Sequence, residues 1–310
     1  MPVYEPTEGI PPNIVHEIGD VTEQLNRDAN LMNAPAQAAA TGWQGLLELQ
    51  FAADQTRTRL AHRLHRGPLM VQRAFYPDGP VCHVYVIHPP GGVVSGDDLS
   101  LQVDVGARAH ALLTTPAAGK FYRRLGARRA TLTQTLRIDA GTLEWLPQET
   151  IYYPNADATL STVIELRGES RFFGWEIGCF GLPASELGIA EGCIRQRLEL
   201  WHDGVPLLLE RVTIDAAAAQ ARWGLAGRVS AGTLMAFPAS AAHLEQARGI
   251  AASLSDSDLL LACTLIGKTL CCRAYAGRAD RLKQAFVELW SGLRAALLGR
   301  TAVAPRIWKT

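Results

Sequence analysis

The chain has 310 residues, enough for one large domain or two ordinary ones with a sizeable core. Hydrophobic residues make up 48% of the sequence and charged residues 19%, a balance that is typical of a globular protein and excludes a largely disordered one. Thirty basic residues balance thirty acidic ones, and this zero net charge argues against nucleic acid or an anionic membrane as the main partner.

Residues 1–40 are predicted to form a flexible tail, because prolines, scattered polar residues and an alanine-rich patch replace any hydrophobic periodicity. They carry no basic-then-apolar signal pattern, and no apolar run in the sequence reaches the length of a membrane span. The six cysteines lack C-x-x-C spacing, which favours reduced, buried thiols. A cytoplasmic protein is therefore expected.

From residue 43 onward the hydrophobic pattern has period two, which predicts β-strands. Clear alternation is found in residues 43–51, 99–105, 131–136 and 160–166. Residues 81–87 are apolar on both faces, as expected of a strand covered on both sides. Residues 193–201 and 205–214 flank Asp203 and Gly204, a pair typical of a hairpin turn. Many short strands separated by turns predict a mainly β protein.

Helical periodicity appears only late in the sequence. Apolar residues spaced by three or four positions trace one face of an amphipathic helix, namely Leu282, Phe286, Leu289, Leu293 and Leu297. Residues 243–254 are expected to form a second, shorter helix. A few helices toward the C-terminal half therefore accompany the strands.

Residues 262–269 match a relaxed phosphate-loop pattern. A working loop curls successive backbone N–H groups around phosphates, which glycine permits and β-branched residues resist. Here Ala262 holds the position of the first glycine, and Thr264 and Ile266 are β-branched. We therefore predict a strand over residues 259–273, with a P-loop nucleotide-binding protein as the alternative.

A tight bend is predicted over residues 88–99, where two prolines, three glycines and two adjacent carboxylates separate apolar segments. His88, Asp97 and Asp98 bracket this bend. Either the carboxylates cap backbone N–H groups of the turn, or the three side chains make a transient metal contact. Imidazole and carboxylate suit borderline divalent ions such as nickel, but nothing in the sequence selects nickel over zinc.

Two further carboxylates, Glu176 and Glu210, lie in apolar segments. An unpaired buried carboxylate is costly, so each must pair with a cation or face water. Arg211 cannot readily pair with Glu210 on a strand, because adjacent side chains point to opposite faces. A salt bridge from elsewhere in the chain and an internal aqueous passage are the two alternatives.

The segment Lys120, Phe121, Tyr122 and Arg123 combines aromatic and cationic side chains, a mixture that is enriched at protein interfaces. It predicts either a partner-binding surface or an ordinary strand edge.

The bend over residues 88–99 and a second motif over residues 114–123, which contains the Lys120 segment, are followed by residues 143–149 and 305–310. This order of motifs resembles the UreD (UreH) family of urease accessory proteins. The resemblance runs from about residue 43 to the end of the sequence, so residues 41–310 are expected to form a single UreD-like, β-rich domain. It implies an elongated β-helical stack of sheets with helices attached near the C-terminal half.

The resemblance also implies a non-catalytic maturation factor. Such a factor joins a UreF-type helical accessory protein and a UreG-type GTPase, and assists nickel incorporation into apo-urease. GTP hydrolysis is then expected from the partner, and nickel is handled transiently without a tightly bound cofactor. The alternatives are the P-loop protein and a β-rich ligand-binding module.

We hypothesise that Asp97, Glu176 and Glu210 face one water-filled passage that hands nickel toward apo-urease, with His88 and Asp98 as secondary contacts. Transport requires sites that bind an ion yet release it, as in channel pores. Single carboxylates with water meet this requirement better than a closed Cys/His cage.

The phosphate-loop match can be tested by Lys268→Ala. If the match is accidental, no phosphate is held, so urease activation in cells should stay nearly unchanged. A folded variant that loses both activation and bound nucleotide would instead favour the P-loop alternative.

Overall fold

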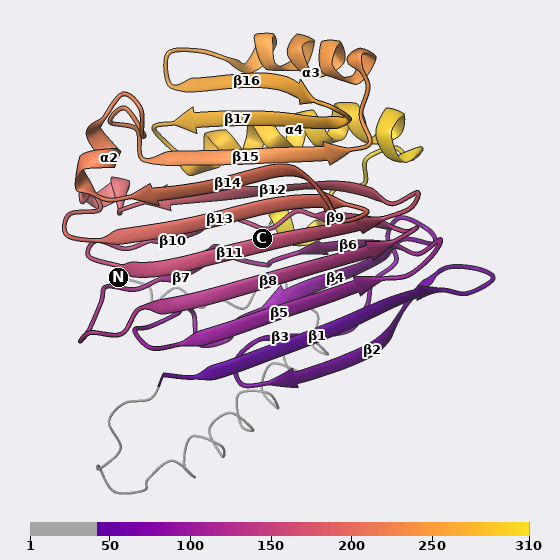
Figure 1. Ribbon diagram of the computed structural model, residues 1–310, viewed down its shortest axis with the longest axis horizontal. Coiled ribbons are helices and arrows are strands. Elements are labelled where there is room, and N and C mark those ends of the chain that lie inside the picture. Colours follow the sequence, from indigo (N-terminus) through magenta and orange to yellow (C-terminus); the bar gives the residue numbers. More distant parts are fainter. Residues whose placement is uncertain (1–41, 310) are drawn as a thin grey trace, which may run out of the picture. The chain divides into compact units, whose positions relative to one another are not determined.

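The computed structural model describes residues 42–309, which form two β-sheets with helices added late in the chain (Figure 1). The tail predicted for residues 1–40 lies outside the described residues. None of the described helices is both long and apolar enough to cross a membrane.

The first sheet has seven strands. In spatial order they are β14 (Val205–Ile214), β13 (Cys193–His202), β11 (Asp157–Arg167), β8 (Ala130–Asp139), β5 (Asp98–Val105), β1 (Gln44–Ala53) and β2 (Thr58–Arg66). The second sheet has ten strands. Its main path is β16 (Leu259–Ile266), β17 (Thr269–Ala276), β15 (Ser230–Phe237), β12 (Arg171–Phe180), β9 (Thr142–Trp145), β6 (His110–Thr114), β4 (Cys82–Ile87) and β3 (Met70–Val71). The short strands β7 (Gly119–Phe121) and β10 (Thr150–Tyr152) pair beside this path.

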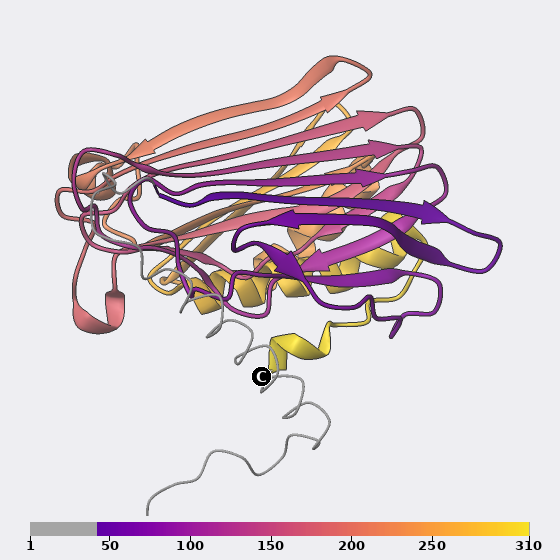
Figure 2. The ribbon, with the colours of Figure 1, turned by 90° about the horizontal axis from the view of Figure 1, so that it is seen from below.

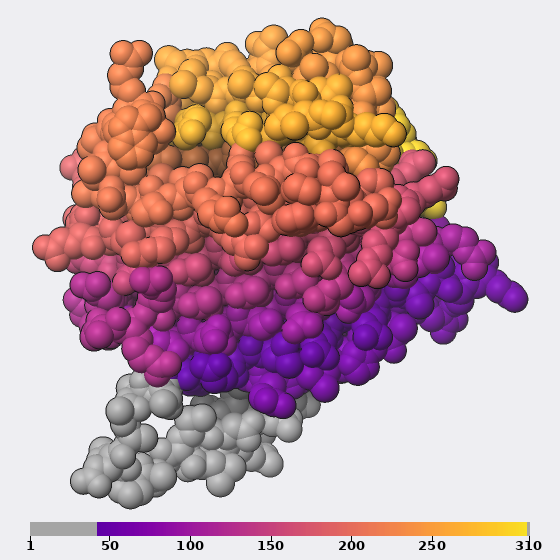
Figure 3. Space-filling view, in the orientation of Figure 1, coloured from indigo at the N-terminus to yellow at the C-terminus, as the bar shows by residue number. Residues whose placement is uncertain are grey.

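The chain winds between the two sheets as a β-helix of about four turns. Strands β5, β8, β11 and β13 pair in parallel in one sheet, while β4, β6, β9 and β12 do so in the other. Each turn lies on the previous one, so the surface colours in Figure 3 follow the chain order. The predicted β-helical architecture is confirmed.

The main core lies between the sheets, where period-two alternation sends apolar side chains inward from both sides. Representative inward residues are Leu47, Leu101, Leu136 and Ile164 from the first sheet, and Val84, Leu113, Leu143 and Phe172 from the second. In the first sheet an antiparallel hairpin lies at each end of the parallel strands, β1 with β2 at one edge and β13 with β14 at the other. The predicted turn at Asp203 and Gly204 joins β13 to β14, with both residues at positive φ.

Three α-helices occur in the described residues, α2 (Ala216–Gln220), α3 (Ala241–Leu254) and α4 (Ala279–Leu298). Helix α4 packs on β12, β15 and β17, against the face of the second sheet that is turned away from the first (Figure 2). All five residues of its predicted apolar face are buried. Helix α3 contacts α4 and β16, close to the predicted position of the shorter helix.

The phosphate-loop match lies on a β-hairpin. The prediction of a single strand over residues 259–273 is wrong. These residues lie in two strands, β16 and β17, which are joined at Gly267 and Lys268. The glycine adopts positive φ, as a tight hairpin turn requires. The strand-to-helix loop of a phosphate site is therefore not formed here, because the chain returns at once as β17.

A buried carboxylate on β9 joins the second sheet to α4. Glu144 is fully buried and accepts hydrogen bonds from Trp290 (2.6 Å) and Arg294 (Nη2, 2.8 Å), and its other contact is the ring of His110 (2.7 Å). Arg294 also donates to Asp78 (2.6 Å). Burial alone would raise the pKa of Glu144, but hydrogen bonds from His110 and Arg294 outweigh it and lower the pKa to about 2.

Removing the cation from this cluster should destabilise the fold. Arg294→Met leaves the buried Glu144 without its arginine and Asp78 with only the more distant Arg300, so the free energy of unfolding should fall by about 3–5 kcal/mol. Urea denaturation measures this loss. Arg300→Met is the control, because Arg300 is partly exposed and reaches Asp78 only at 3.6 Å. An Arg294→Met variant as stable as the control would contradict the assignment.

Candidate functional site

Two cavities adjoin Glu176, which lines both of them. The first, of about 410 Å³, lies between β14 and the strands β12, β15 and β17. Its lining includes the charged and polar residues Glu176, Gln196, Glu210, Thr233 and Arg273. The second, of about 300 Å³, extends from Glu176 to the two motifs singled out in the sequence.

Glu176 bridges the two sheets. On β12 its neighbours Trp175 and Ile177 pack outward under α4, so alternation points Glu176 inward. Its carboxylate accepts a hydrogen bond from the hydroxyl of Thr162 on β11 in the opposite sheet. No Lys, Arg or His pairs with it among residues 42–309. Burial raises the pKa of Glu176 to about 7, and the nearby charge of Glu210 acts in the same direction.

Glu210 has a cationic partner. The Nε atom of Arg273 donates to its carboxylate at 2.7 Å, and the hydroxyl of Thr233 donates at 3.4 Å. Arg211, its neighbour on β14, binds Glu199 instead, at 3.1 Å. Glu210 is therefore held by a salt bridge from elsewhere in the chain and also faces the first cavity.

The second cavity is lined by both sequence motifs. His88, Gly91 and Val93 come from the bend, and residues 115–121 come from the second motif. Two buried nitrogens at this cavity have no hydrogen-bond partner in the described protein, His88 Nε2 and Trp145 Nε1. Buried polar groups are normally satisfied by water or a ligand, so the two nitrogens mark polar positions in a cavity whose other lining is largely apolar, with Leu99, Leu101 and Leu132 among it.

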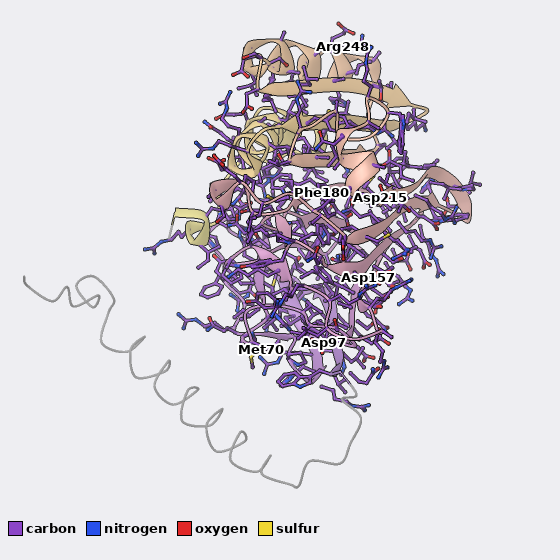
Figure 4. All side chains as sticks on the ribbon, turned by 90° about the vertical axis from the view of Figure 1, so that its left-hand side faces the viewer. Met70, Asp97, Asp157, Phe180, Asp215 and Arg248 are labelled. Carbon is purple, nitrogen blue, oxygen red and sulfur yellow. The ribbon has the colours of Figure 1, made fainter. Side chains whose placement is uncertain are left out.

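Asp97 holds the backbone of the bend. Its two carboxylate oxygens accept hydrogen bonds from the amides of Trp43 (2.8 Å) and Val94 (2.9 Å). It lines neither cavity, and in Figure 4 it lies well apart from Phe180, whose ring borders the first one. Asp98 is exposed at the start of β5. The structure thus brings Glu176, Glu210 and His88 to the cavities and leaves the two aspartates outside both.

The predicted partner-binding segment is divided between core, cavity and surface. Phe121 is only 1% exposed and stacks on Tyr152, so it is a core residue and is not available to a partner. Lys120 lines the second cavity. Tyr122 is half-buried, and Arg123 alone of the four is exposed.

Several site residues escaped sequence reasoning, because they come from strands far apart in the chain. Thr162, Thr233 and Arg273 lie in different strands, and no local pattern distinguishes them. Their positions follow only from strand register, which places Thr233 opposite Glu176 and Arg273 opposite Thr233. Across the described residues, no group of three or more His, Cys, Asp or Glu side chains is arranged to hold a metal ion.

The raised pKa of Glu176 predicts a pH-dependent stability difference. In the unfolded chain this carboxyl ionises near 4.5, whereas in the folded protein it keeps its proton up to about pH 7. Its contribution to stability is therefore complete below pH 4.5 and is lost as the pH rises through 7. Glu176→Gln cannot ionise, so its stability relative to wild type should rise by about 1–3 kcal/mol from pH 5 to pH 8.

Urea denaturation at several pH values measures this difference. Glu165→Gln on β11 is a matched control, because that carboxylate is exposed and pairs with Arg137 at 3.3 Å. Parallel stability curves for wild type and Glu176→Gln over this range would show that Glu176 is well solvated in the folded protein.

Comparison of the sequence with known proteins identifies the family of the chain. Residues 44–309 match the UreD urease accessory protein family. A urease accessory protein UreD from Enterobacter sp. (strain 638) is 40% identical over 281 residues, which cover 90% of this chain and 100% of the relative. The corresponding protein from Azoarcus sp. (strain BH72) is 42% identical over 279 residues, covering 88% and 96%. The chain therefore belongs to the UreD family of urease accessory proteins.

Proposed function

We propose that this protein is a non-catalytic maturation factor through which nickel reaches apo-urease. A UreF-type helical protein and a UreG-type GTPase are its proposed partners, and the GTPase supplies nucleotide hydrolysis. Nickel is a transient cargo of the protein and not a resident cofactor.

The observation that carries this proposal is that one carboxylate, Glu176, lines both cavities and has no cationic partner among residues 42–309. Joined at Glu176, the cavities would form a passage from the Glu210 region to His88 and Lys120. Carboxylate, imidazole and water are suitable ligands for a borderline divalent ion. Glu210, Glu176 and His88 are the proposed contacts in order along the passage, and Asp97 maintains the bend that positions His88.

Isolated carboxylates favour transport over storage. A site with three or four protein ligands holds its metal tightly, whereas one carboxylate completed by water binds weakly enough to release the ion. Because Glu176 is inclined to keep its proton near neutral pH, proton loss accompanies cation binding there and weakens it further.

A chromosomal Glu176→Gln substitution should lower nickel per urease active site severalfold under limiting nickel, because glutamine cannot lose a proton to become a carboxylate ligand. Deleting the whole gene should lower nickel further while leaving the urease subunits folded. Nickel content is measured by atomic absorption on purified urease. Glu165→Gln serves as the control for loss of a carboxylate.

Assembly must be measured in the same strains. Co-purification of the variant with the accessory proteins and apo-urease separates a transport defect from a failure to assemble. Normal nickel content in urease from the deletion strain would overturn the proposed function. Normal nickel content in the Glu176→Gln strain alone would overturn the passage.

A further inference from the structure

Three residues form one row across the inner face of the second sheet. Glu176 on β12 is opposite Thr233 on β15, which in turn is opposite Arg273 on β17. Neighbouring strands are about 4.8 Å apart, so the three side chains rise side by side into the first cavity. Glu210 meets this row from β14 in the other sheet and binds both Thr233 and Arg273.

The charges around the first cavity are not equivalent. Arg211 is engaged by Glu199, which also binds Arg197 at 2.6 Å. Arg273 is thus the cation that neutralises Glu210, while Glu176 accepts a hydrogen bond from the Thr162 hydroxyl and has no cationic partner in the described part of the chain. Glu210, which Arg273 neutralises, therefore faces the same cavity as Glu176, which has no cationic partner among residues 42–309.

We propose, on the basis of the proposed function, that Arg273 is the resident counter-ion of Glu210 and sets the affinity of the passage for its divalent cargo. An arriving cation displaces the guanidinium from Glu210 and takes Glu210 and Glu176 as its protein contacts. When the cation moves on, Arg273 returns to Glu210. Competition between the fixed guanidinium and the mobile ion keeps binding reversible.

The geometry allows this exchange. The side chain of Arg273 is 40% exposed and that of Glu210 is 20% exposed, so the guanidinium can swing toward solvent without leaving a buried charge unpaired. Thr233 remains bound to Glu210 and keeps it oriented toward the row. With Arg273 in place, Glu210 and Glu176 together present at most one net negative charge to a divalent ion; without Arg273 they present at most two.

The test is nickel binding to the full-length protein, measured by equilibrium dialysis with Ni²⁺ alone. Arg273→Gln should bind Ni²⁺ about tenfold more tightly than wild type, the effect expected of removing a nearby, partly solvated positive charge. Arg211→Gln is the control, because Arg211 is the neighbour of Glu210 on β14 but binds Glu199 on the opposite face of that strand. Its affinity should stay within about twofold of wild type.

Arg273→Lys retains the charge and should bind nickel as wild type does, and it covers the case in which Arg273→Gln folds poorly. In a Glu210→Gln background, Arg273→Gln should change the nickel affinity little further, because Arg273 and the nickel ion no longer compete for a carboxylate at position 210. Tighter binding should also slow release, so the Arg273→Gln strain should deliver less nickel to urease.

The outcomes separate this inference from the function it rests on. If Glu176→Gln and Glu210→Gln weaken nickel binding but Arg273→Gln leaves it unchanged, the passage stands and the role of Arg273 is refuted. Equal tightening by Arg273→Gln and Arg211→Gln would also refute it, since only the general field of the cavity would matter. If neither glutamate substitution alters nickel binding, the passage itself is wrong.

Discussion

The ion pair between Glu144 and Arg294 is the interaction on which the arrangement of the second sheet and α4 depends. A carboxylate buried this deeply is tolerated only because a guanidinium, an indole and an imidazole satisfy it together. The contact fixes α4 on the outer face of the sheet. Trp175 and Ile177 then pack beneath that helix, and strand alternation turns the residue between them toward the interior. The direction of Glu176 is thus a consequence of outer packing.

Three glutamates illustrate how the same side chain acquires different properties from its partners. Glu144 is fully matched by Arg294, and its pKa is lowered to about 2. Glu210 is matched by one partly exposed arginine. Glu176 has a single hydroxyl, and burial raises its pKa to about 7. The first is suited to holding the fold together, and the last two are suited to exchanging partners. Burial alone therefore does not distinguish a structural carboxylate from a functional one.

Periodicity predicted the strands, the Asp203 turn and the apolar face of α4, because each is encoded within a few neighbouring residues. It did not predict the Glu144–Arg294 pair, whose members are 150 positions apart, nor the role of Arg273. It also overlooked the turn within residues 259–273, since Gly267 is followed by Lys268 and not by a usual turn partner. The aromatic side chain of Phe121 suggested a partner-binding surface, whereas the structure places this side chain in the core. Long-range partners require the register of the folded stack, which one sequence does not supply.

The late position of α4 has a consequence for biosynthesis. Glu144 leaves the ribosome 150 residues before Arg294, an interval of about 8 to 30 seconds at ordinary elongation rates. The parallel turns contact mainly their neighbours, so they can assemble as they emerge. Throughout that interval α4 does not yet cover the outer face of the second sheet, and the carboxylate of Glu144 lacks its partner Arg294. The nascent chain is most exposed to aggregation then, so a holding chaperone would be needed over this interval more than before or after it.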